Sequence, residues 1–187
     1  WQPDVALEVG RRPRHQLVVA ALGLDARGVG DRRVAGGRVG EELERGREIE
    51  QRLHVRLVRL AAASDEELRA LGQSRQKAGY LRSLATLTLS GELDLEHLPE
   101  DNEEAIALLT KVKGIGRWSA EIYLLFAEGR PDVFPAGDLA VQIELGRLLG
   151  AEGKPAEKWL RERAESWAPY RGAAAVLAWH SYNTKVL

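Results

Sequence analysis

Near its middle the chain reads Leu109-Thr110-Lys111-Val112-Lys113-Gly114-Ile115-Gly116-Arg117-Trp118-Ser119-Ala120-Glu121, which is the most informative part of the sequence. Its pattern is a helix end, a Gly-x-Gly turn and a new helix start. Glycines let a backbone approach a ligand closely, and the free N–H groups at a helix start attract an anion. The stretch therefore predicts a helical hairpin, in which the turn either holds a phosphate or is an ordinary connection between helices.

Further helices are predicted on both sides of this hairpin. Ser64-Asp65-Glu66-Glu67 is a capping box, and Ser74 and either Asp101 or Asn102 are candidate N-caps of two further helices. The apolar spacing and the Gly and Pro positions predict other helices at about 41–60, 117–127, 139–149, 155–166 and 170–182, with a short buried piece at 17–24. Because no strand alternation is present, the predicted fold is all-α.

The composition excludes several classes of protein. The formal net charge of −1 argues against a protein that coats nucleic acid through bulk positive charge. Without cysteine there is no disulfide framework, thiolate zinc site or cysteine-held iron–sulfur cluster. No signal-peptide pattern or membrane-spanning run of about 20 apolar residues is found. We expect a cytoplasmic protein.

A second informative stretch is the loop Val133-Phe134-Pro135-Ala136-Gly137, which ends at Asp138 and a predicted helix start. Asp often serves as an N-cap at such a position. Alternatively, a fixed carboxylate can stabilise the positive charge that develops on a sugar when its N-glycosidic bond breaks, and can guide a water. The two roles are compatible.

The hairpin, the Val-Phe-Pro loop and the following Asp together resemble the helix-hairpin-helix (HhH-GPD) DNA glycosylase superfamily, in particular its alkylbase branch of the 3-methyladenine II type. The resemblance implies two helical lobes with a catalytic cleft between them, Asp138 as the catalytic carboxylate, no required cofactor, and a monomer that acts on double-stranded DNA carrying alkylated bases. The matching phosphate-holding positions are Gly114, Gly116, Arg117 and Ser119, and the carbonyls of Thr110, Val112 and Ile115 match a structural monovalent-cation site.

The resemblance also bears on the reaction and the base pocket. Lyase members carry a nucleophilic Lys directly after the Gly-x-Gly-x of the hairpin, where this chain has Trp118, so a monofunctional enzyme is expected. Alkylated purines are often cationic, and an aromatic pocket can hold them by stacking and cation–π attraction. Trp118, Tyr123 and Trp179 are the candidate pocket residues, although Trp118 and Tyr123 could instead pack in the core. Trp167, in the closing Trp-x-Pro-x-Arg stretch, is assigned to the core.

The resemblance covers residues 60–187, whereas residues 1–59 form an atypical segment rich in Arg and Gly. We hypothesise that a shifted reading frame produced this segment, which would ordinarily join the C-terminal helices in one lobe. Three alternatives to an alkylbase glycosylase stay open: a non-catalytic DNA-binding module, an inactive remnant of the enzyme, and a glycosylase for another lesion.

Overall fold

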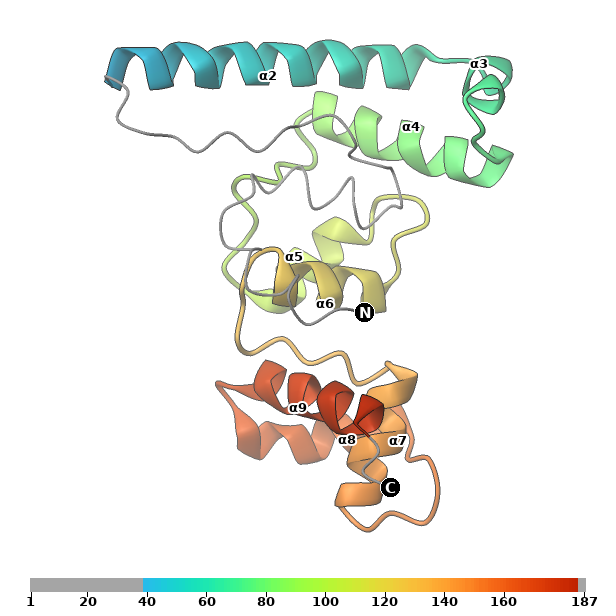
Figure 1. Cartoon of the computed structure of the whole chain (residues 1–187), viewed down its shortest axis with the longest axis vertical. Helices are drawn as coiled ribbons and strands as arrows, with labels where there is room; N and C mark the ends of the chain where they lie inside the picture. Colours follow the sequence, from blue (N-terminus) through green and yellow to red (C-terminus); the bar gives the residue numbers. More distant parts are fainter. Residues whose placement is uncertain (1–38, 185–187) are drawn as a thin grey trace.

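The computed structural model describes residues 39–184, in which all regular structure is helical and no strand occurs. Its elements are α2 (Val39–Ala62), α3 (Asp65–Ala70), α4 (Arg75–Leu89), α5 (Asn102–Leu109), α6 (Arg117–Phe126), α7 (Leu139–Leu148), α8 (Glu157–Ala164), the short 3-10 helix η3 (Glu165–Trp167) and α9 (Arg171–Asn183). Figure 1 shows α2–α6, the hairpin lobe, stacked end to end on α7–α9, the C-terminal lobe. The predicted all-α, two-lobed fold is confirmed. None of the described helices is both long and apolar enough to cross a membrane.

The helix starts that the sequence predicts are present. Ser64 Oγ accepts from Glu67 N–H at 3.1 Å while Glu67 reaches back to Ser64 N–H at 2.8 Å, which completes the capping box of α3. Ser74 caps α4. Of the two candidate caps for α5, Asp101 is the one used, because its Oδ1 accepts from Glu104 N–H at 2.9 Å.

Each lobe has its own core, and the loop before α7 passes from one to the other. Val133 is buried in the core of the hairpin lobe, among residues such as Ile106 and Leu124. Its neighbour Phe134 is buried in the core of the C-terminal lobe, beside Leu160. Successive side chains of an extended segment point in opposite directions, so the adjacent residues Val133 and Phe134 anchor this loop in the cores of both lobes.

The long helix α2 belongs to the hairpin lobe. Its half-buried leucines, Leu53, Leu57 and Leu60, recur at helical spacing, and α2 packs along α4. We expected the N-terminal segment to join the C-terminal helices in one lobe. This expectation is wrong for α2, which lies at the opposite end of the molecule from α7–α9 (Figure 1). Helix α2 also continues without interruption through residue 60, where the resemblance to the superfamily was taken to begin. The apolar piece at 17–24 lies outside the described residues, and the origin of the segment stays a hypothesis.

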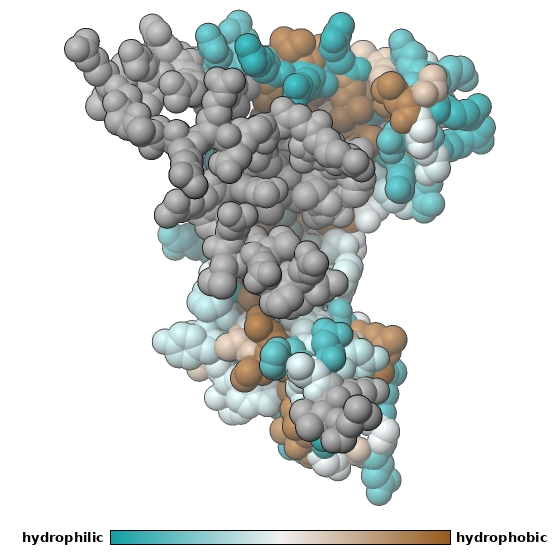
Figure 2. Space-filling model, in the orientation of Figure 1, coloured by the Kyte–Doolittle hydropathy of each residue, from teal (hydrophilic) through white to brown (hydrophobic). Residues whose placement is uncertain are grey.

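The surface of the C-terminal lobe carries several exposed apolar side chains. Leu139 is 60% exposed, at the start of α7, and Leu177 is 67% exposed, on α9. On the face drawn in Figure 2, hydrophobic residues appear over both lobes among hydrophilic ones. Asp138 lies directly before the exposed Leu139, so the predicted catalytic residue is next to an accessible surface.

Candidate active site

The hairpin turn is packed against α4 at its glycine. Gly114 has φ +89°, a left-handed conformation that favours glycine. A Cβ at this position would lie 2.5 Å from the ring of Tyr80, so the ring leaves no room for a side chain. The N–H of Lys113 donates to Ser83 Oγ at 2.9 Å, which adds a second contact with α4. The turn is therefore packed closely against α4 at two adjacent residues.

The first turn of α6 offers backbone N–H groups at the predicted phosphate site. Gly116 is the N-cap of this helix and has no side chain with which to cap it. The N–H groups of Arg117, Trp118 and Ser119 have no acceptor within the helix, because the first N–H groups of any α-helix lack one. A phosphate oxygen is the kind of acceptor that such groups bind.

The side chain of Arg117 is paired with carboxylates of the protein and is not directed to the predicted phosphate site. It donates to Glu103 Oε2 at 2.8 Å and to Glu121 Oε1 at 2.9 Å. These two carboxylates raise the pKa of the Arg117 guanidinium, so the group stays charged and paired within the protein. The predicted contribution of Arg117 to phosphate binding is thus restricted to its backbone N–H.

Asp138 joins the two lobes through its carboxylate. It is the N-cap of α7, where Oδ1 accepts from Val141 N–H at 3.0 Å. The same Oδ1 accepts from the indole Nε1 of Trp179 at 3.0 Å, and Oδ2 accepts from the indole Nε1 of Trp118 at 2.9 Å. The predicted N-cap role of Asp138 is therefore confirmed, and its catalytic role stays a prediction. Asp138 caps a helix, and it is a fixed carboxylate between two aromatic side chains.

The three predicted pocket residues do not all lie at this carboxylate. Trp118 is 49% exposed, which excludes the core alternative for it. Trp179 is half-buried and stacks obliquely on Phe126 of α6, with ring centroids 5.6 Å apart. Tyr123 is instead 8% exposed within the core of the hairpin lobe, and its hydroxyl donates to Glu128. The prediction of Tyr123 as a pocket wall is wrong, because its position on α6 turns it inward.

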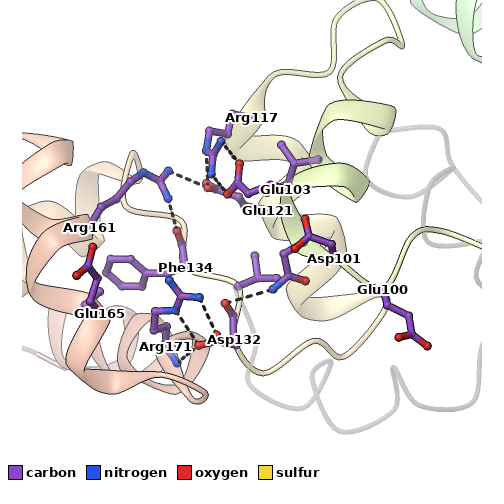
Figure 3. Close-up of a pocket in the computed structure, with 14 residues that line it drawn as sticks. Glu100, Asp101, Glu103, Arg117, Glu121, Asp132, Phe134, Arg161, Glu165 and Arg171 are labelled. Atoms are coloured by element: carbon purple, nitrogen blue, oxygen red, sulfur yellow. Dashed lines mark hydrogen bonds and ion pairs between the residues drawn. The ribbon is translucent and has the colours of Figure 1, made fainter.

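A cavity of about 490 Å³ lies between the lobes, and of the charged residues that line it the sequence analysis had named only Arg117 as a site residue. Figure 3 shows Glu121 and Arg117 of α6 facing Arg161 of α8, with Arg171 of α9 against Asp132. Asp138 and the two tryptophans are not among the residues that line this cavity. Arg117 directly follows the Gly-x-Gly turn, and Arg171 belongs to the closing Trp-x-Pro-x-Arg stretch. These two motifs were the signals that could have pointed to this cluster.

The charges in this cavity perturb one another. Burial raises the pKa of the Glu121 carboxyl, and the hydrogen bonds from Arg161 and Arg117 oppose that rise. The Arg117 hydrogen bonds lower the pKa of Glu103, and those from Arg171 lower the pKa of Asp132. The Arg117 pairs lie within the hairpin lobe, whereas Arg161 joins α8 to Glu121 of α6 and Arg171 joins α9 to Asp132 of the connecting loop. Among residues 39–184 no cluster of three or more His, Asp or Glu side chains could hold a metal ion.

Comparison with known proteins assigns this helical chain to a class of DNA repair protein. The sequence model described as "HhH-GPD superfamily base excision DNA repair protein" matches residues 45–169, and the chain belongs to this superfamily. It is 39% identical over 124 residues to DNA-3-methyladenine glycosylase 1 of Schizosaccharomyces pombe, a match that covers 65% of this chain and 53% of the relative. It is 33% identical over 123 residues to DNA-3-methyladenine glycosylase 2 of Escherichia coli, covering 66% and 41%. The chain thus spans about half the length of these curated relatives.

Solved structures show the same fold. The crystal structure of a DNA-3-methyladenine glycosidase from Bacillus halodurans superposes with a TM-score of 0.64 at 27% identity, covering 92% of this chain and 77% of that one. A 3-methyladenine DNA glycosylase of Schizosaccharomyces pombe in complex with abasic DNA superposes with a TM-score of 0.59 at 28% identity, covering 95% of each chain. The suspected superfamily is therefore confirmed.

Proposed function

We propose that this chain is a monofunctional DNA glycosylase that hydrolyses the N-glycosidic bond of alkylated bases of the 3-methyladenine type in duplex DNA. The observation that carries the proposal is the Asp138 carboxylate held between the indole N–H groups of Trp118 and Trp179. Relatives named DNA-3-methyladenine glycosylase support the class of substrate.

The chemistry follows from the charge that develops as the base departs. The sugar becomes positively charged, and a carboxylate fixed by three N–H donors needs little reorganisation to stabilise it. A water at the same carboxylate then supplies the oxygen that replaces the base. An indole nitrogen is only a donor and cannot form the covalent imine that a lyase needs, so Trp118 in the Lys position favours hydrolysis alone.

The flipped base would lie against the exposed ring of Trp118, with Trp179 on the other side of the carboxylate. A cationic alkylated purine gains cation–π attraction from such rings, and an ordinary base gains less. Selectivity would further reflect the weakened glycosidic bond of the alkylated base.

The hairpin would hold the DNA backbone through the N–H groups around Gly114 and Gly116, Arg117 and Ser119. We further propose that a monovalent cation binds the carbonyls of Thr110, Val112 and Ile115, which belong to one tight turn between α5 and α6. The carbonyl of Val112 already accepts from Ile115 N–H at 3.0 Å, which leaves its second lone pair for a cation.

The experiment is release of 3-methyladenine from alkylated duplex DNA by the purified chain and by two matched variants. Asp138→Asn removes the charge, and Asn caps helices about as well as Asp. Asp101→Asn makes the same change at the N-cap of α5, outside the proposed site. We expect Asp138→Asn to release base at least about 100-fold more slowly and Asp101→Asn to match the wild type.

Two further outcomes separate the alternatives. DNA that breaks at the abasic site only after alkali would support hydrolysis, whereas breakage without alkali would contradict the monofunctional assignment. If the wild type releases no base but binds abasic duplex DNA, a non-catalytic DNA-binding module replaces the proposed function.

A further inference from the structure

The carboxylate of Glu121 is buried where the two lobes meet. It is 1% exposed, and one oxygen, Oε1, accepts from Arg117 of the same helix at 2.9 Å and from Arg161 of α8 at 2.8 Å. Arg117 belongs to the hairpin lobe, as Glu121 does, so within residues 39–184 it is Arg161 alone that connects this carboxylate to the C-terminal lobe (Figure 3).

Arg161 also contacts two residues of its own side, Glu157 and Phe134. Its Nε donates to Glu157 Oε1 at 2.9 Å, one turn earlier on α8, and its Nη1 donates to the carbonyl of Phe134 at 3.3 Å. Phe134 lies in the loop that ends at Asp138. Glu157 also borders this loop, because a Cβ on Gly137 would lie 3.2 Å from Glu157 Oε2. One guanidinium therefore links α6 to the loop that carries the proposed catalytic residue.

Glu121 and Trp118 lie three residues apart on α6, a spacing that puts side chains on neighbouring parts of one helix face. Each makes a contact across to the C-terminal lobe, Trp118 to Asp138 at 2.9 Å and Glu121 to Arg161 at 2.8 Å. Two such contacts fix the position of α6 relative to Asp138 better than either alone. Without Arg161, a small shift of α6 would lengthen the hydrogen bond between Trp118 and Asp138, and such bonds weaken steeply with distance and angle.

We propose that Arg161 and Glu121 are a positioning pair that holds the indole of Trp118 against the carboxylate of Asp138. This inference rests on the proposed function for its effect on rate. Neither residue hydrogen-bonds to Asp138, Trp118 or Trp179, so the proposed pair acts by positioning Trp118 and not on the substrate. A misplacement of about 1 Å at a catalytic group can lower a rate by about 100-fold.

The test compares Arg161→Gln with Arg147→Gln. Arg147 pairs with the nearly buried Glu144 on α7, within one lobe, so its removal weakens a similar ion pair without touching the lobe contact. We expect Arg161→Gln to lower kcat for base release by about 10- to 100-fold with KM changed little, and Arg147→Gln to leave kcat within about twofold of the wild type. Equal losses in the two variants, well below their unfolding temperatures, would overturn the proposal.

A double-variant comparison distinguishes positioning from general destabilisation. If Arg161 acts through Trp118, adding Arg161→Gln to Trp118→Phe lowers kcat by no more than about twofold further. If the two losses multiply, the pair does not act through the indole and the proposal fails.

A second measurement needs no activity. The chain has five tryptophans, so its indole N–H groups give five nuclear magnetic resonance signals, and Trp118→Phe identifies the one from Trp118. We expect Arg161→Gln to shift this signal upfield as its hydrogen bond lengthens, and Arg147→Gln to leave it unchanged. An unmoved signal overturns the positioning pair even where the wild type releases base. A wild type that releases no base, with the signal shifted in Arg161→Gln, leaves the pair intact and contradicts the proposed function alone.

Discussion

Gly172 lies in the first turn of α9, and the substitution Gly172→Ala is the most direct test of the contact between α9 and the residues before it. The N–H of Gly172 donates to the carbonyl of Pro131 at 2.8 Å, so the helix lies directly on the connecting loop. A Cβ on Gly172 would be 2.7 Å from that carbonyl oxygen and 2.5 Å from Cδ1 of Leu125. The Leu125 side chain can rotate away, but the carbonyl belongs to the backbone, so Gly172→Ala must push α9 from the loop.

The expected loss in the free energy of unfolding can be separated from the general effect of a Gly→Ala change by making the same change at a second helical glycine. Gly79 in α4 has nothing within 4 Å of its would-be Cβ, so Gly79→Ala stabilises by about 0.5–1 kcal/mol through the unfolded chain. Overpacking a filled site costs about 1–3 kcal/mol. For a domain of this size the melting temperature of Gly172→Ala should then lie about 2–12 °C below that of Gly79→Ala.

The assay is thermal unfolding of both variants and the wild type, followed by far-ultraviolet circular dichroism. If Gly172→Ala melts with or above Gly79→Ala, α9 does not lie on the connecting loop as described, and the argument from close approach is refuted.

Three further outcomes test other parts of the structure. Ser64→Ala removes one half of the capping box and should cost about 1 kcal/mol in urea unfolding, and an unchanged midpoint would contradict the cap. Arg171 holds the pKa of Asp132 below its ordinary value, so the pair stabilises the folded state above about pH 4 and this contribution is lost as pH falls further. Arg171→Gln should therefore lose less stability than the wild type between neutral and acid pH. Gly114→Ala should lose about 1–2 kcal/mol from its positive φ alone, plus the cost of moving the Tyr80 ring, with weaker binding to abasic DNA as the second readout.

Local signals in the sequence predicted most of the helices. The capping box at Ser64, the Gly-x-Gly turn and the N-cap Asp138 are encoded within a few residues, and each is present where the sequence places it. The helix at 41–60 was predicted from its leucine spacing alone, and the structure extends it by two residues at each end.

These local signals could not predict contacts between residues that are far apart in the sequence. The spacing of apolar residues in α6 does not show whether Trp118 or Tyr123 faces inward, because this depends on how α4, α5 and the connecting loop pack. In the structure Tyr123 is buried and Trp118 is exposed. Arg117 matched a phosphate-binding position, but its side chain pairs with Glu103, which lies 14 residues earlier in the chain. Similarly, nothing in the local sequence joins Glu121 to Arg161, which are 40 residues apart.

Asp138 is the N-cap of α7 and the proposed catalytic carboxylate, and this combination has a consequence for how a mutation at Asp138 would be detected in a cell. Cellular quality control degrades chains according to how often they unfold, and it does not sense lost chemistry. Because Asn starts a helix about as well as Asp, the single change Asp138→Asn should leave a chain that persists at normal abundance. Under the proposed function, such a chain would keep its hairpin and still bind lesions that it cannot process. Cells that carry both forms should then repair alkylation damage more slowly than cells that carry the wild-type form alone.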